Sequence, residues 1–391
     1  MGFAAFFLIG WTGLLVPSLI RQVQGTFGQT DSGMGLAYLL ASVLYVTGTM
    51  AVGVLARHVP RRAVLGAGPC LMAAGLVVAA AAPGWTVFLA GYALAGLGSG
   101  IVDAGVNALF MDLYPGRAAM LNRLHLFFAL GALAAPLAVG TAVGSGLPWP
   151  WLLLLTAAVA APVGIALGSQ PMPPAHPVEP EADDASSGAT SPEGWAGSRG
   201  RVGLGRAPLL LLAIAIGCYV ATELGVSSWL VRYLEPAPLE VATLALSLFW
   251  ASLGLGRLVS SFVVDRMGAV RFATVWAAGC GVAIVAAIVV PWLPAAIALF
   301  AVAGFAAGPV YPMIMAIGGS LYPGRASMVS STLASAAIVG SIVYPPLMGV
   351  VSETAGLWWS MLGAGLFVIG GAAAIWSAAA IARRRGRPMP A

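Results

Sequence analysis

The six residues Leu113-Tyr-Pro-Gly-Arg-Ala118 recur as Leu321-Tyr-Pro-Gly-Arg-Ala326, 208 residues later in a chain of 391. Both copies follow an apolar, Gly-rich stretch and precede one rich in Ser, Ala and Gly. The same offset aligns the start of the basic loop at 53–62 with the start of the loop at 261–271. Because the repeat keeps its register across several loops, it indicates a duplicated unit, and we expect both halves to share one topology.

The composition indicates that this unit folds in a membrane. Sixty percent of the residues are hydrophobic, 8% are charged and the mean hydropathy is +0.95, whereas about a quarter of the residues are charged in soluble globular chains. A helix that crosses about 30 Å of hydrocarbon needs roughly 20 apolar residues. Twelve stretches meet this need, at 2–22, 33–56, 62–82, 84–112, 115–143, 149–168, 207–233, 239–264, 269–290, 292–320, 323–351 and 356–382. We predict an all-α membrane protein with twelve transmembrane helices in two pseudo-symmetric six-helix halves.

Residues 170–206 differ from the rest, because they are rich in Pro, acidic residues, Ser, Gly and Arg. We interpret them as a flexible cytoplasmic linker between a first half at 1–169 and a second half at 207–391 with a short basic tail. The first apolar stretch lacks a basic leader and exceeds signal-peptide length, so we expect a retained helix and leave open whether the start lies upstream of Met1. The three cysteines fall inside predicted helices and suggest packing rather than disulfides, and we expect no metal or cofactor.

The arginines predict the orientation. If Met1 is inside, the outside loops hold only Arg21 and Arg232. The inside segments hold Arg57, Arg61, Arg62, Arg117, Arg199, Arg201, Arg206, Arg266, Arg271, Arg325, Arg383, Arg384, Arg385 and Arg387. The positive-inside rule then predicts a multi-pass protein of the inner (cytoplasmic) membrane with both termini in the cytoplasm. The net charge of +5 is a consequence of topology, so we expect lipid, protons and a small-molecule substrate as partners, no nucleic acid, and a monomer.

Two six-helix halves, a long central loop and a basic turn after the second helix of each half resemble the major facilitator superfamily. Its loop pattern Gly-x-x-x-Asp-Arg-x-Gly-Arg-Arg is partly present in both halves. In the first half Gly53, Arg61 and Arg62 match and Arg57 replaces the acid, and in the second half Asp265, Arg266 and Gly268 match and Ser261 replaces the glycine. The resemblance implies that Arg57, Arg61, Asp265 and Arg266 belong to an inner gate. We assign Arg257, near the inner end of its helix, to the same gate or to a structural role outside the site.

Function is expected to come from polar side chains within the spans. A carboxylate at a helix centre costs about 2.5 to 3.5 kcal/mol, so it must face a cavity or a partner. The candidates are Asp103, Asn107, Asn122, Arg123, His125, Glu223 and Arg257. The repeat serves as a control, because at the same offset Asp103 aligns with Tyr311 and Glu223 with Leu15. The scaffold therefore does not require charge at these positions.

Distances along the chain pair some of these residues. Asp103 and His125 each lie about eleven residues from the turn at 114–116, and Asn107 and Asn122 lie seven or eight away, so each pair is level at about 1.5 Å per residue. We predict that Asp103 and His125 form a protonation site; the alternative is a static hydrogen bond that holds two helices together. Glu223 has no cation within two turns of its own helix, and we expect it to bind substrate hydroxyls or to carry the proton.

Three stretches, 96–107, 121–136 and 219–230, are similar to the fucose-galactose-gluconate:proton symporter branch, which includes bacterial fucose and glucose permeases. That branch carries an acid on helix 4, an Asn near the start of helix 5 and an acid on helix 7, as Asp103, Asn122 and Glu223 do here. The fucose permease also uses an acid on helix 1, and residues 2–22 contain none. Proton coupling is therefore expected at Asp103 or Glu223.

Sugar sites combine aromatic platforms with amide and carboxylate groups. We predict that substrate is bound by Trp11, Tyr38, Asn107, Asn122, Tyr219, Glu223, Trp229 and Tyr311, with Tyr45 and Trp250 as further aromatic candidates. Trp11 and Tyr219 occupy equivalent positions in the two halves, on helices that line the cavity in the superfamily.

We therefore predict a secondary active transporter of a small polar solute, a sugar or a sugar-like compound, that works by proton-coupled alternating access. One alternative is a proton-driven exporter of a drug or metabolite, whose Gly- and Pro-rich helix-5 pattern matches residues 131–140 only in part. Another is a transporter-like sensor without transport. No nucleophile and base pair, phosphate loop or metal spacing is evident, so we do not expect an enzyme.

Overall fold

The computed structural model describes residues 1–56, 58–115, 117–172 and 205–385. Within them all regular structure is helical, which confirms the predicted all-α class. The first half contains α1 (Gly2–Ser18), α2 (Ile20–Phe27), α3 (Asp31–Leu55), α4 (Arg61–Ala80), α5 (Trp85–Leu113), α6 (Ala118–Gly144) and α7 (Pro150–Ser169). The second contains α8 (Ala207–Tyr233), α9 (Leu239–Met267), α10 (Ala269–Val289), α11 (Leu293–Ala307), α12 (Val310–Leu321), α13 (Ala326–Ala355) and α14 (Leu357–Arg384). Most of the predicted linker lies outside the described residues.

The helices account for the twelve predicted spans. Eleven spans of the described chain are long and apolar enough to cross a membrane, with α11 and α12 counted together as Leu293–Leu321. The pair α1 and α2 makes a twelfth, bent by 53°. The bend follows Pro17, whose ring disturbs a continuous helix. This first span reaches Phe27, five residues beyond the predicted end at residue 22.

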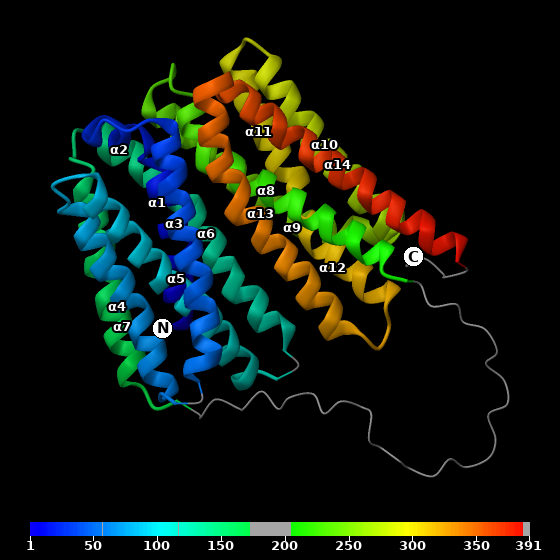
Figure 1. Cartoon of the computed structure of the whole chain (residues 1–391), viewed down its shortest axis with the longest axis horizontal. Helices are drawn as coiled ribbons and strands as arrows, with labels where there is room; N and C mark the ends of the chain where they lie inside the picture. The colour runs from blue at the N-terminus through cyan, green and yellow to red at the C-terminus, as the bar shows by residue number, and fades with distance from the viewer. Residues whose placement is uncertain (57, 116, 173–204, 386–391) are drawn as a thin grey trace.

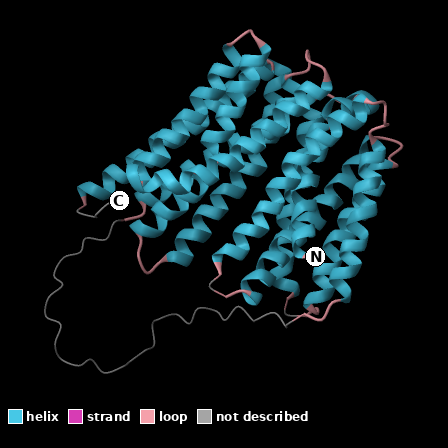
Figure 2. Cartoon of the chain, turned by 180° about the vertical axis from the view of Figure 1, so that it is seen from behind, coloured by secondary structure: helices cyan, strands magenta, loops and turns pink. Residues whose placement is uncertain are grey.

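The duplication is visible in the packing of the two halves. Helices α3 and α9 start at Asp31 and Leu239, and α6 and α13 start at Ala118 and Ala326, so both pairs keep the 208-residue offset. Helix α3 packs on α13, and α6 packs on α9. Each half therefore presents the same two helices to the other, in a pseudo-symmetric arrangement in which the two bundles lie side by side (Figures 1 and 2).

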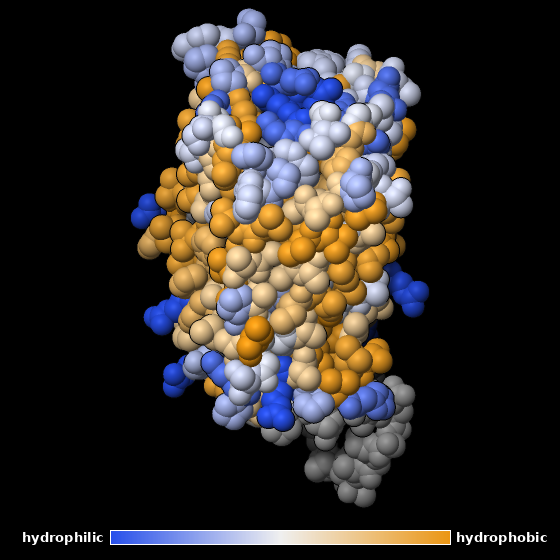
Figure 3. All heavy atoms as spheres, turned by 90° about the vertical axis from the view of Figure 1, so that its left-hand side faces the viewer, coloured by the Kyte–Doolittle hydropathy of each residue, from blue (hydrophilic) through white to orange (hydrophobic). Residues whose placement is uncertain are grey.

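The surface is that of a multi-pass membrane protein. Figure 3 shows a hydrophobic band around the middle of the molecule, with hydrophilic residues gathered at the two ends. Large apolar side chains such as Ile165, Val282 and Leu366 are more than half exposed. Lipid chains solvate such a band, while the helices satisfy their own backbone hydrogen bonds.

The two ends of the molecule differ in charge. One, called the basic end below, carries helix ends at Arg61, Arg117, Arg206, Arg266, Arg325 and Arg384. The other, called the closed end, carries the connections at 28–30, 145–149, 234–238 and 356. The ribbons of the two halves diverge from the closed end toward the basic end (Figure 1).

The tenth span is broken where it packs against α9. Helix α11 ends at Ala307 and α12 begins at Val310, because Pro309 between them has no N–H and clashes with a continuing helix. At Gly308 an added β carbon would clash with the Leu253 carbonyl and lie 2.8 Å from the Arg257 nitrogen. The glycine thus lets α9 approach the break closely, and this approach fixes the position of Arg257.

Candidate functional site

Asp103 on α5 is held by two neutral donors. Helix α3 approaches α5 closely because Gly96 and Gly100 have no side chain; a β carbon at Gly100 would clash with the Tyr45 carbonyl. The Tyr45 hydroxyl donates to Asp103 Oδ2 at 2.7 Å, and Asn107 Nδ2 donates to Oδ1 at 3.0 Å. Each carboxylate oxygen therefore accepts one hydrogen bond from an uncharged group, and Asp103 remains partly exposed.

His125 on α6 lies near this carboxylate but is not hydrogen-bonded to it. The two groups interact electrostatically, while the imidazole ring packs edge-on against Phe6 at 5.4 Å. Helices α5 and α6 pack mainly against other helices, α3 and α4 for one and α1 and α9 for the other. Among the hydrogen bonds of the described residues, none joins Asp103 and His125, as the alternative interpretation would require. His125 and Asn122 are both exposed.

Glu223 on α8 is the centre of a second group. The Tyr219 hydroxyl, one turn away, donates to Glu223 Oε2, and the rings of Tyr219 and Tyr311 lie 6.5 Å apart. The Arg257 guanidinium interacts electrostatically with all three residues. Arg257 also interacts with His125 of the other half. The second group therefore joins an acid, an arginine and two phenols, and it faces the first group across the interface of the halves.

Arg257, which the sequence analysis assigned to the gate or to a structural role, lies beside Tyr219 and Glu223 in the structure. A signal in the sequence would have indicated this. Arg257 lies ten residues before the end of α9 at Met267, and Asp103 lies ten residues before the end of α5 at Leu113. Both helices run toward the basic end, so the arginine and the carboxylate are at equal depth.

The structure does not bring Trp11 into either group. Its indole Nε1 donates to Thr156 Oγ1 at 2.9 Å on α7. The ring lines a lateral, mainly apolar pocket of about 710 Å³ bounded by α1, α6 and α7. Trp11 and Tyr219 align in the repeat, but their side chains therefore have different surroundings.

Tyr38 and Trp229 lie together in a buried contact between the halves. They do not lie beside Glu223. Their rings meet edge to face at 5.7 Å, and both side chains are buried. The Tyr38 hydroxyl donates to the Ser228 carbonyl at 3.1 Å, and Trp229 Nε1 donates to the Pro345 carbonyl at 2.8 Å. Their polar atoms are thus satisfied by the protein itself.

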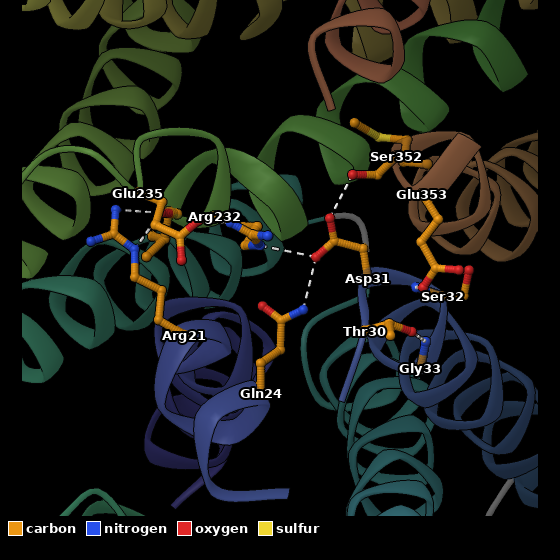
Figure 4. Close-up of polar contacts among 12 residues, drawn as sticks. Arg21, Gln24, Thr30, Asp31, Ser32, Gly33, Arg232, Glu235, Ser352 and Glu353 are labelled. Atoms are coloured by element: carbon orange, nitrogen blue, oxygen red, sulfur yellow. Dashed lines mark hydrogen bonds and ion pairs between the residues drawn. The ribbon is translucent and has the colours of Figure 1, made fainter. Parts of the chain in front are cut away.

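A polar network at the closed end joins the halves (Figure 4). Asp31, at the start of α3, is 8% exposed. Its carboxylate accepts hydrogen bonds from Gln24 at 2.8 Å and, across the interface, from Arg232 at 2.9 Å and Ser352 at 2.5 Å. Sequence reasoning missed Asp31, and it treated Arg232 only as an exception to the charge rule.

Arg21 of α2 adds a second connection to the same network. Its guanidinium donates to the Val231 carbonyl at 2.7 and 2.9 Å and to the Ala237 carbonyl at 2.8 Å. Deeper in the molecule, Ser247 donates to the Leu133 carbonyl at 2.9 Å. Hydrogen bonds thus join the halves from this level up to the closed end.

The predicted gate residues are only partly visible. Arg61 forms an ion pair with Asp112 at 2.6 Å, which ties α4 to α5 within the first half. Arg266 is exposed near the end of α9. Arg57 and the side chain of Asp265 lie outside the described part of the chain. The first half therefore has an ion pair at this end, between Arg61 and Asp112, although Arg57 replaces the acid of the loop pattern.

Comparisons with known proteins agree with this architecture. Residues 1–296 match the model of the Major Facilitator Superfamily. A gentisate transporter of Corynebacterium glutamicum is 25% identical over 96% of this chain and 86% of its own length. The sodium-dependent glucose transporter 1A of Mus musculus is 29% identical, over 37% of this chain and 34% of that protein.

Two solved structures share the fold. A bacterial homologue of the human lysosomal transporter Spinster, in an inward-facing and occupied conformation, superposes with a TM-score of 0.80 at 14% identity and covers 100% of this chain and 98% of its own. A D-xylose-proton symporter superposes with a TM-score of 0.78 at 14% identity, over 96% of this chain and 95% of its own.

Proposed function

Because the chain belongs to the Major Facilitator Superfamily of membrane transporters, we propose that it carries a small polar solute by proton-coupled alternating access. The observation that carries the proposal is the meeting of two acidic groups, centred on Asp103 and Glu223, at an accessible level between the halves. Hydrogen bonds close the interface on one side of this level, and on the other side the halves diverge. Solute and proton would bind there and be released when the halves rock.

The orientation follows from the charges. With the basic end in the cytoplasm, the arginines obey the positive-inside rule and both termini are cytoplasmic. The closed end then faces outward, and the conformation described is open toward the cytoplasm. This arrangement makes 1–169 and 207–391 the two moving bodies and 170–206 their tether, in the inner membrane.

For the proton, Asp103 with His125 is the favoured site. Tyr45 and Asn107 hydrogen-bond to the Asp103 carboxylate without adding charge. Protonation of Asp103 therefore leaves no directly paired cation without its partner. For the solute, the likeness to the fucose-galactose-gluconate branch and to glucose transporters supports a sugar or a sugar-like compound. The likeness to a gentisate transporter over nearly the whole chain supports a hydroxylated aromatic acid as the second candidate.

Proteoliposomes that contain a trapped pH dye test the proposal. Sugars, sugar acids, aromatic acids and cationic drugs are first screened by thermal shift, because a ligand of the native state raises its stability. Each ligand found is then added outside the vesicles. Symport acidifies the interior in either protein orientation, whereas the alternative, proton-driven export by antiport, makes it alkaline. A ligand that binds but moves neither itself nor protons would leave only the sensor interpretation.

A further inference from the structure

Arg257 is held firmly, yet its charge is not neutralised by a direct ion pair. Its Nε donates to the Gly308 carbonyl at 3.1 Å, at the break between α11 and α12. No ion pair within 4 Å joins Arg257 and Glu223 in the described residues; the Glu223 carboxylate instead accepts from Tyr219. The Arg257 side chain is exposed at the interface of the halves. The guanidinium is therefore held by the Gly308 carbonyl and by a side-chain hydrogen bond with Tyr219, and no carboxylate of the described residues pairs with it directly.

The surroundings distinguish this arginine from the other central groups. Arg257 interacts with Tyr219, Glu223 and Tyr311 of its own half and with His125 of the other. Helix α12 begins at Val310, two residues after the carbonyl that anchors Arg257, and has no side-chain cap. The first N–H groups of a helix and a guanidinium favour the same kind of ligand, an anion.

A second observation indicates how far the candidate site extends along α9. The Trp250 indole Nε1 is buried and has no hydrogen-bond partner in the described residues. Trp250 lies seven residues before Arg257, two turns along the same face of α9 and about 10 Å away. Its ring packs against Phe128 of the other half, with centroids 6.0 Å apart. An unsatisfied buried donor calls for an acceptor, and a solute that spans this distance would supply one.

We propose that Arg257 binds a carboxylate of the solute, so that the substrate is an organic acid with a hydrogen-bond acceptor at its far end. The inference rests on the proposed transport function and specifies its substrate class. Glu223 is the acid of the same half that interacts electrostatically with Arg257. When a second carboxylate binds Arg257, Glu223 loses its countercharge and takes up one proton from water. One acid anion and one proton then cross together, without net charge.

The groups that face Glu223 are consistent with this exchange. Its own helix contributes Tyr219, α9 contributes Arg257, α12 contributes Tyr311 and α10 contributes Cys280. From α13, Tyr344 instead donates to the Ser360 carbonyl at 2.6 Å. Arg257 is the one cation among them, so what occupies Arg257 decides whether Glu223 keeps its charge.

The test compares matched acids and neutral analogues on the purified full chain. The probes are gluconate against glucose and 4-hydroxybenzoate against 4-hydroxybenzamide, with acetate, benzoate and lactate as further acids. We expect at least one acid to raise Tm while its neutral analogue does not. Arg257→Gln should weaken its binding roughly ten- to hundredfold, as loss of a charged hydrogen bond does. Arg257→Lys should restore part of the affinity, and the matched control Arg271→Gln, on exposed Arg271 of α10, should change nothing.

Glu223→Gln should increase the affinity for the acid at high pH, and a misfolded protein would not show such an increase. It removes the competing carboxylate, so the acid should bind as tightly at pH 8 as it binds to the wild type at pH 6. In proteoliposomes, uptake of the acid should not respond to a potassium diffusion potential. Neutral sugars that bind wild type and Arg257→Gln equally and enter with protons would overturn this inference and leave the transport function standing. If no acid binds in an Arg257-dependent way, the inference also falls. Arg257-dependent binding without any uptake would instead overturn the transport function.

Discussion

The closed end and the centre both place an acid near an arginine, but in different ways. At the closed end Asp31 and Arg232 form a direct ion pair at 2.9 Å across the halves, and the carboxylate is almost fully buried and fully hydrogen-bonded. At the centre Glu223 and Arg257 come from one half, do not pair directly and remain accessible. A satisfied pair can hold a conformation, whereas an acid and an arginine that do not pair directly can take part in ligand binding. We therefore expect the closed end to stabilise one conformation and the centre to bind the solute.

The first acid of the centre has a third kind of environment. Asp103 has no cation within ion-pair distance in the described residues and depends on Tyr45 and Asn107. Its equivalent in the repeat, Tyr311, belongs to the group around Glu223. The duplicated halves have thus diverged where they carry charge, one toward an acid with neutral donors and the other toward an acid with an arginine.

The largest effect is expected from Asp103→Asn. Asparagine keeps acceptor and donor atoms for Tyr45 and its neighbours but does not titrate. If Asp103 carries the coupled proton, solute accumulation driven by a pH gradient should fall to the level of protein-free liposomes, while exchange of labelled for unlabelled solute should continue near the wild-type rate. Accumulation that keeps its wild-type pH dependence in Asp103→Asn would assign the coupled proton to Glu223 and remove the contrast between the two central acids.

Local patterns predicted the helices and the contacts within them. Apolar runs of sufficient length gave the twelve spans, and the i, i+4 spacing placed Asp103 beside Asn107 and applies equally to Tyr219 and Glu223. The contacts that decide function join different helices. Tyr45 reaches Asp103 because Gly96 and Gly100 let α3 approach α5, and Arg257 on α9 lies beside Tyr219 on α8.

The placements that the sequence did not predict have the same origin. Trp11 faces α7 because of the rotation of α1 about its own axis. Since α1 is apolar on every face, its sequence does not reveal this rotation. Asp31 is the first residue of α3, where helical periodicity does not yet mark a buried charge, and its partners Arg232 and Ser352 are distant in sequence. The depth of Arg257 in the bundle can be counted in residues from the end of α9. Whether its side chain faces Glu223, however, depends on the packing of α9 against α11.

An intermediate effect is expected at the closed end from Asp31→Asn. Asparagine weakens the contact with Arg232, and loss of a charged hydrogen bond costs about 1.5 to 3 kcal/mol. Since this contact exists only while the closed end is shut, the outward-open state should become more populated. The reporter of this opening is a cysteine that replaces Ser228, whose carbonyl accepts the hydrogen bond from Tyr38. It is introduced into a protein that lacks Cys70, Cys218 and Cys280 and is labelled with a membrane-impermeant maleimide. Its labelling from the closed end should be several times faster than with native Asp31.

Glu235→Gln is the matched control for that experiment. Glu235 also pairs with Arg232, but both lie in the second half, within three residues of each other. Removing its charge should leave the labelling rate unchanged, because the pair is the same in both states. Equal acceleration in Glu235→Gln and Asp31→Asn would mean that Arg232 acts through general charge balance, and the closed end would lose its role in holding the state.

The smallest effect is expected from Asp112→Asn at the basic end. Asp112 pairs with Arg61 at 2.6 Å, within the first half, and its side chain is 26% exposed. Partly exposed pairs contribute about 0 to 1 kcal/mol, so Tm in detergent should fall by at most a few degrees. Because α4 and α5 belong to the same half, neither the labelling of the Ser228 cysteine nor accumulation driven by a pH gradient should change. A shift in labelling as large as that of Asp31→Asn would show that this pair senses the other half, and the division between charges that set the state and charges that only stabilise one half would no longer hold.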